Sequence, residues 1–166
     1  MLVFPSWPGL PYEPANPELN IAPKTIALVS AGTDPPLVRA LQTVIHATVR
    51  FSNGAGGPGR RIEGFTITSR NEQAADDGIR LWSRAADIVG NIITGNQGKG
   101  IEIIASDGIP RTASQITGNI VSNNGDTGIY IEGADATIDC KTGVPGETAP
   151  IFNNGLSGET DKGSGI

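Results

Sequence analysis

The stretch GNIITGN at residues 90–96 returns as GNIVSNN at residues 118–124, 28 positions later. A Gly-Ile pair follows each copy, at Gly100 and at Gly128. Self-similarity at about 20–50 residues is typical of a solenoid, in which each repeat buries its apolar face against the next repeat. The spacing therefore predicts a stack of short structural repeats.

Three segments align with one another and extend this repeat. They are IEGFTITS from Ile62, IVGNIITG from Ile88 and ITGNIVSN from Ile116. The alignment produces three columns, made of Ile62, Ile88 and Ile116, then Gly64, Gly90 and Gly118, then Ile67, Ile93 and Val121. Counting the Gly-Ile pairs at 78, 100, 128 and 165, the repeat length runs from 22 to 37 residues.

The Gly-Ile segments GIRL, GIEI and GIYI alternate aliphatic residues with other types. This period of two indicates short strands with one face inward. Because strands of successive coils lie about 4.8 Å apart, we expect equivalent residues to stack, with Ile79, Ile101 and Ile129 in one internal column.

The sequence thus predicts an all-β, single-stranded parallel β-helix of about six coils, with two or three strands in each coil. We expect coils over residues 24–166, the last one incomplete, after a lead-in over residues 1–23 that carries five prolines in its first 20 residues. Only LVRALQTV, from Leu37, is predicted to form a turn or two of helix.

Asn96 and Asn124 hold the same position in the repeat, at a predicted turn. Asparagine tolerates left-handed backbone and can hydrogen-bond to its stacked counterpart. We expect these two side chains to form a ladder with a structural role.

Composition limits the possible partners. The net charge is −5 and the pI is near 4.8, and Lys and Arg are not clustered, which argues against a nucleic-acid partner. No apolar run approaches the length of a membrane-spanning helix, so we expect no membrane insertion. The single cysteine, Cys140, excludes an intrachain disulfide and is expected to be inert.

The two ends of the chain suggest a fragment. The start, MLVFPSWPGLPYEP, lacks the charged region of a signal peptide, and the final DKGSGI resembles the beginning of another repeat. We expect an export signal outside this chain and an extracellular or cell-surface location. An interrupted solenoid exposes strand edges, so we also predict self-association through the open ends.

The segments RRIEGFTIT, GNIITGN…GIEI and GNIVSNN…GIYI resemble the coils of right-handed parallel β-helix proteins of the pectate-lyase-like superfamily. The resemblance covers about residues 24–166 and implies right-handed winding. That superfamily contains lyases, hydrolases, epimerases, phage tailspikes and non-catalytic surface proteins, so the fold alone does not specify a function.

The segment ADDGIRL places Asp76 and Asp77 directly before a strand, as polygalacturonases of that superfamily place an aspartate pair. The segment GKG follows one coil later, where that family has GHG. This resemblance implies glycoside hydrolysis with Asp76, Asp77 and Lys99 as candidate catalytic residues. Lys99 replaces the family histidine, and no aspartate occupies the matching place one coil upstream. The alternative is a surface ion pair between Asp77 and Lys99.

Calcium is the one cofactor that the resemblance brings into consideration, because β-helix lyases bind it through carboxylates. Asp76 and Asp126 share a column two coils apart, roughly 9.6 Å by the strand spacing, and are the candidate metal ligands. The intervening coil would have to contribute, and it offers Gly98 there.

Arg80, Glu102 and Tyr130 form a predicted outward column, and Trp82 closes the edge of the same face. Such side chains bind sugars by hydrogen bonding and ring stacking, or they form a cross-strand ladder in which Arg80 pairs with Glu102. His46 is expected to be a solvated strand residue.

The leading hypothesis is an extracellular module that binds polysaccharide along this face, with or without processing it. The alternatives are a structural or adhesive stalk, and a pectin-degrading hydrolase or lyase.

Overall fold

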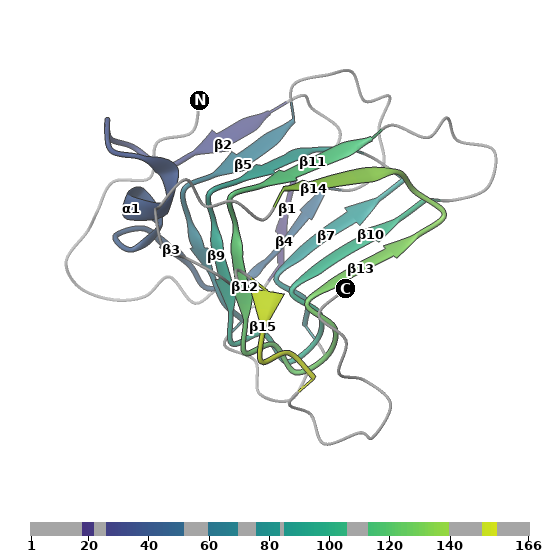
Figure 1. The fold of residues 1–166 in the computed structure, drawn as a ribbon. Helices are drawn as coiled ribbons and strands as arrows, with labels where there is room; N and C mark the ends of the chain where they lie inside the picture. Colours follow the sequence, from purple (N-terminus) through teal and green to yellow (C-terminus); the bar gives the residue numbers. More distant parts are fainter. Residues whose placement is uncertain are drawn as a thin grey trace.

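The computed structural model describes residues 18–21, 26–51, 60–69, 76–83, 85–105, 113–139 and 151–155. In these residues the chain forms three parallel sheets of five strands each (Figure 1). Sheet A contains β1 (Glu18–Asn20), β4 (Thr48–Phe51), β7 (Ile79–Trp82), β10 (Ile101–Ile104) and β13 (Ile129–Glu132). Sheet B contains β2 (Ala27–Val29), β5 (Arg61–Glu63), β8 (Asp87–Val89), β11 (Ser114–Thr117) and β14 (Ala136–Asp139). Sheet C contains β3 (Val44–Ile45), β6 (Thr66–Ile67), β9 (Ile92–Thr94), β12 (Ile120–Ser122) and β15 (Ile151–Phe152).

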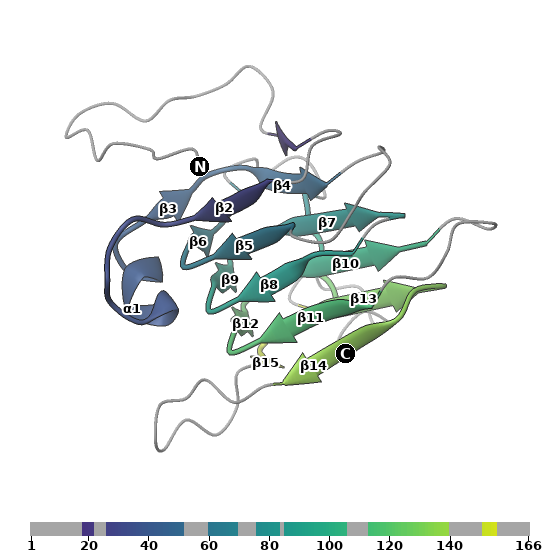
Figure 2. The same ribbon diagram turned by 90° about the horizontal axis from the view of Figure 1, so that it is seen from above.

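Each coil supplies one strand to sheet A, one to sheet B and one to sheet C, in chain order. Figure 2 shows the coils stacked in sequence from β1–β3 to β13–β15. The prediction of an all-β parallel solenoid is confirmed, with three strands per coil. The described residues account for five coils, and the predicted start of a sixth at Gly165 lies outside them.

The first coil begins earlier than the sequence predicts. Glu18–Asn20, placed above in the lead-in, forms β1 and pairs in parallel with β4. Leu19 stands beside Val49 and packs against the core. One aliphatic residue in a proline-rich stretch carries no periodic pattern, so only its neighbour in the next coil reveals the strand.

The interior is built from stacked aliphatic columns. Ile79, Ile101 and Ile129 are in register and at most 1% exposed, as predicted. Sheet B stacks Ile62, Ile88 and Ile116, and sheet C stacks Ile67, Ile93 and Val121. All nine belong to one hydrophobic cluster. Burial of these columns is the main stabilising contribution to the stack.

Gly78 and Gly100, the glycines of two Gly-Ile pairs, fit a crowded corner between sheets C and A. A Cβ added at Gly100 would lie 2.6 Å from the Gly128 carbonyl oxygen and 2.6 Å from Val121 Cγ1. Gly78 meets the same obstacle, with a Cβ 2.6 Å from Ile93 Cγ2 and 2.7 Å from the Gly100 oxygen. The repeated glycine therefore reflects a lack of space for a side chain.

Asn96 and Asn124 form the predicted ladder at this corner. Asn96 Nδ2 donates to Asn124 Oδ1 at 2.8 Å, and Asn124 Nδ2 donates to Asn154 Oδ1 at 2.8 Å. The left-handed backbone, however, belongs to the residue before each ladder asparagine. Those residues are Gly95, Asn123 and Asn153, with φ of 69°, 55° and 52°.

A second asparagine ladder occupies the corner between sheets B and C. Asn91 Nδ2 donates to Asn119 Oδ1 at 3.1 Å, and both side chains are buried. Gly90 and Gly118 precede them with φ of 56° and 63°. This second ladder was not predicted, although the Gly-Asn pair that begins both repeat copies was a signal for it.

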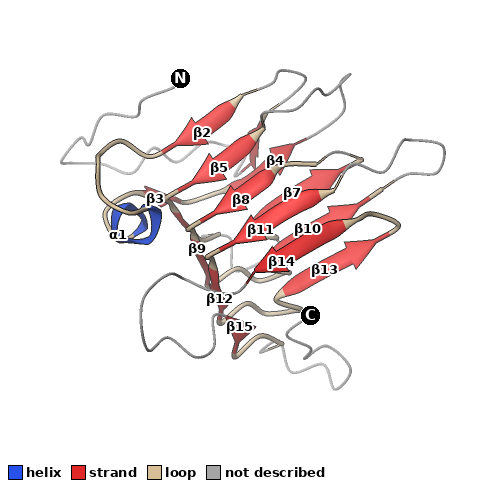
Figure 3. Ribbon diagram, turned by 45° about the horizontal axis from the view of Figure 1, so that its top comes forward, coloured by secondary structure: helices blue, strands red, loops and turns tan. Residues whose placement is uncertain are grey.

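The short helix α1 (Pro36–Ala40) matches the helical turn predicted near Leu37, and it lies beside the coils rather than in a sheet (Figure 3). Arg39 anchors it, because its buried guanidinium donates to the Ser30 carbonyl and pairs with Glu63 of β5. Among the described residues no helix is long and apolar enough to span a membrane.

Candidate functional site

The outward column of sheet A is the predicted one, and it is longer. The strand register sets Arg80 beside Glu102 and Glu102 beside Tyr130. Arg50 of β4 precedes Arg80 in the same column. Arg50 was not among the predicted column residues, although TVRF at residues 48–51 has the same alternation as the later strands.

Glu102 is the centre of a charge network on this face. Its carboxylate pairs with Arg80 Nε at 2.7 Å and with Lys99 Nζ at 2.8 Å, and these partners leave it 5% exposed. Burial by itself raises the pKa of Glu102, but the hydrogen bond from Lys99 and the charges of Arg80 and Lys99 outweigh burial, so the pKa is lowered. The predicted Arg80–Glu102 pair is therefore present, and it is not a simple surface contact.

Asp77 is buried, only 2% exposed, at the entrance to β7. Its Oδ1 accepts the backbone N–H of Lys99 at 2.7 Å, and its Oδ2 accepts Arg80 Nε at 3.0 Å and Nη2 at 2.6 Å. Burial raises the pKa of this carboxyl more than the Lys99 N–H and the Arg80 charge lower it. Asp77 thus ties its own coil to the next one.

The expected surface ion pair between Asp77 and Lys99 is wrong. Asp77 contacts the backbone of Lys99, while the Lys99 ammonium reaches Glu102. A lysine side chain extends past the residue stacked beside its Cα, so its partner depends on which carboxylate lies within reach and not on the repeat position alone.

The three catalytic candidates, Asp76, Asp77 and Lys99, lie in adjacent coils. The hydrogen bond from Gly98 N to Asp76 O joins these two coils next to them. Glycoside hydrolysis needs one carboxyl at the leaving oxygen and another that activates water. Asp77 has both oxygens engaged inside the protein, and Lys99 is paired with Glu102. The geometry favours structural roles for Asp77 and Lys99, and their catalytic assignment stays a prediction. Asp76 is half-buried, and its Oδ2 has no hydrogen-bond partner in the described part of the chain.

Asp76 and Asp126 do share a column, with Gly98 between them, since Asp126 N donates to Gly98 O at 3.0 Å. Asp126 Oδ1 already accepts the N–H and hydroxyl of Thr127. Calcium requires about six to eight oxygen ligands. Across the described ranges no group of three or more His, Cys, Asp or Glu side chains could hold a metal ion, so these two residues alone do not fit calcium.

Two partly exposed aromatic rings stand on the same sheet as the charge network. Trp82 is 41% exposed at the end of β7, and Tyr130 is 36% exposed on β13. Arg50 Cζ lies 5.6 Å from the centre of the Trp82 ring, and Lys99 Nζ lies 5.0 Å from that of Tyr130. These cation–π contacts help to hold the rings in place.

Tyr130 is also fixed through its hydroxyl, which donates to Glu132 Oε2 at 2.9 Å. That hydrogen bond is the main reason why the pKa of Tyr130 is raised. The four predicted sugar-binding residues, Arg80, Glu102, Tyr130 and Trp82, are thus all on sheet A. His46 lies outside this sheet, in the half-buried turn between β3 and β4, and Cys140 lies outside the described residues.

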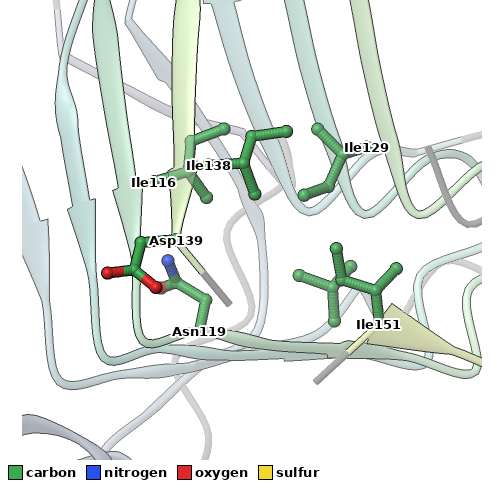
Figure 4. A pocket seen from close by; sticks show the side chains of 7 residues that line it. Ile116, Asn119, Ile129, Ile138, Asp139 and Ile151 are labelled. Carbon is green, nitrogen blue, oxygen red and sulfur yellow. The ribbon is translucent and has the colours of Figure 1, made fainter. Parts of the chain in front are cut away.

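A small apolar hollow opens at the last coil, inside the stack (Figure 4). Its volume is about 10 Å³, room for about one water molecule and far less than the roughly 300–1,000 Å³ of small-molecule sites. Five aliphatic core residues and two polar residues line it: Ile116, Val121, Ile129, Ile138 and Ile151, with Asn119 and Asp139. Its lining belongs to the core of the last described coils, and its size does not suit a ligand.

Comparison with known proteins supports the fold. A family model described as a right handed beta helix region matches residues 49–142, more than half of the chain. The match contains most of the sheet A column, from Arg50 to Tyr130. No curated protein matches the chain, and no solved structure does.

Proposed function

Because the chain belongs to the right-handed beta helix family, its coils stack into regular sheet faces, and we propose that sheet A binds a polysaccharide. The observation that carries this proposal is the placing of Trp82 and Tyr130 on one face, each exposed by more than a third and each held by a cation. In this proposal the protein acts outside the cell.

The rings supply apolar surface that can stack against the C–H face of a sugar. Arg80 and Glu102 are in register with Tyr130, and Trp82 lies two residues beyond Arg80 on the same strand; Arg80 and Glu102 can exchange hydrogen bonds with hydroxyl groups. Trp82 is on β7 and Tyr130 is on β13, two coils apart, which is roughly 9.6 Å along the stack. A ligand that touches both rings is therefore an extended chain rather than a single sugar.

The rival proposal is a structural or adhesive stalk, for which sheet A needs no ligand. The test replaces both rings, as Trp82→Ala with Tyr130→Ala, and leaves Arg80 and Glu102 intact because they hold the coils together. Each ring contributes about 0.5–1.5 kcal/mol, so the double variant should bind about 5- to 150-fold more weakly.

Binding is measured by affinity electrophoresis in gels that contain polysaccharides of different backbones. Phe152→Ala is the matched control, since Phe152 is also 41% exposed but lies on sheet C. We expect the control to be retained like the wild type. The proposal fails if the wild type is retained by no polymer, or if the double variant is retained as strongly.

A further inference from the structure

The outward face of sheet A carries three cations, and each already has a carboxylate partner in the described residues. Arg50 pairs with Glu18 at 3.0 Å, and both Arg80 and Lys99 pair with Glu102. A free anion would have to displace one of these carboxylates. Glu102 is buried beneath its partners, so removing a cation from it would leave an uncompensated charge in a desolvated place.

Among the described residues of this face, carboxylates outnumber cations. Arg50, Arg80 and Lys99 are opposed by four carboxylates, which belong to Glu18, Asp77, Glu102 and Glu132. The whole chain carries a net charge of −5 as well. Neither the local nor the global field therefore attracts a polyanion.

Two of the cations also contact an aromatic ring, and this second contact opposes their binding to a ligand anion. Arg50 lies against Trp82, and Lys99 lies against Tyr130. An acidic sugar that drew either cation away would release the ring that is meant to stack on it. The chemistry left for a ligand is ring stacking, with hydroxyl groups that donate to carboxylates and accept from guanidinium N–H groups without displacing either.

We infer that the polysaccharide bound by sheet A is uncharged. This inference rests on the proposed function and narrows it to polymers recognised through hydroxyl groups and C–H faces. It departs from the acidic substrates that the resemblance to pectin-degrading enzymes implies.

The test uses pairs of polymers that share a backbone and differ in charge. Polygalacturonate is compared with its methyl ester, and carboxymethyl cellulose with hydroxyethyl cellulose. Retention of the whole chain is measured at about 20 mM and about 0.5 M NaCl. The Debye length falls from roughly 20 Å to roughly 4 Å between these concentrations, so charge attraction is weakened while stacking is largely unchanged.

We expect the uncharged member of at least one pair to be retained at least tenfold more strongly than its acidic partner, with less than about a twofold change between the two salt concentrations. Stronger retention of an acidic member, lost at high salt, would overturn the inference while leaving sheet A as a polysaccharide-binding face. If no member of either pair is retained, and no polymer of the broader panel is retained either, the proposed function fails and the inference falls with it.

Discussion

Asn124 shows how much one side chain does in this fold. It is fully buried, and its amide oxygen accepts Asn96 Nδ2 at 2.8 Å and Asn96 N at 3.3 Å. Its amide nitrogen donates to Asn154 Oδ1 at 2.8 Å and to Ile93 O at 3.3 Å. One residue thus satisfies polar groups in three successive coils, at a corner where strand hydrogen bonding is interrupted.

At this scale we predict that Asn124→Ala destabilises the protein by about 2 kcal/mol or more, since each buried polar group left without a partner costs about 1–3 kcal/mol. Denaturant unfolding followed by circular dichroism measures the change. Asn123→Gly is the matched control, because Asn123 is exposed with φ of 55°, which glycine adopts without strain. We expect the control to stay within about 0.5 kcal/mol of the wild type. Equal effects of the two substitutions would contradict the ladder as a stabilising feature.

At the scale of the element, sheet A is held by its charge network as well as by its backbone ladder. Glu102 on β10 forms ion pairs with Arg80 of β7 and with Lys99, which lies in the turn before β10. Asp77, in the preceding coil, accepts hydrogen bonds from the same Arg80 side chain and from the backbone N–H of Lys99. The network therefore connects neighbouring coils on the face proposed to bind sugar.

For this element we predict a pH-dependent stability that Glu102 supplies. Its pKa lies below the usual 4.5 in the folded state, so the stabilisation is present above that value and is lost as pH falls through the lower folded pKa. Glu102→Gln should cost about 1–3 kcal/mol at neutral pH, and its difference from the wild type should shrink below about pH 4.5. Thermal midpoints measured from neutral to acid pH test this.

Asp77 works in the opposite direction, because its pKa is raised by burial and its ionisation costs stability as pH rises. Asp77 is present in both the wild type and Glu102→Gln. The difference in stability between these two proteins therefore reports mainly on Glu102. Lys99→Met provides the control for the pair. Combined with Glu102→Gln it should cost less than the two single effects added, since both remove the same contact. A difference from the wild type that stays constant with pH would contradict the role given to Glu102.

At the scale of the molecule, the last described strand of each sheet pairs on one side. Among the described residues β13, β14 and β15 each pair with a single neighbour, and Ile131, Ile138 and Ile151 on them are only partly buried. Unpaired strand edges are templates for further pairing. These edges are where we expect one copy to pair with another.

We predict concentration-dependent self-association, measured by multi-angle light scattering. Thr137→Lys adds a charge to the exposed side of β14 and should reduce the association, because lysine on an edge strand disfavours strand addition. A constant monomer mass for the wild type over a wide concentration range would refute this prediction.

The sequence by itself determined the solenoid and its internal columns. Side chains alternate strictly along a strand, and the same residue types return in every coil, so Ile79, Ile101 and Ile129 could be aligned without coordinates. The Arg80, Glu102 and Tyr130 column followed from the same periodicity. The asparagine ladder was predicted at one corner and missed at the other.

Only the tertiary structure decided which partners the long polar side chains choose. Arg50 reaches Trp82 and Lys99 reaches Glu102 and Tyr130, so each contact joins residues that the repeat does not align. It also decided that Asp77 is buried and that residues 18–20 complete the first coil. The physical reason is the length of these side chains. A local period sets each backbone position, but the end of a flexible side chain goes to the most favourable charge or ring within its reach. That partner lies in the same coil for the Lys99–Glu102 pair and in another coil for the Arg50–Trp82 and Lys99–Tyr130 contacts.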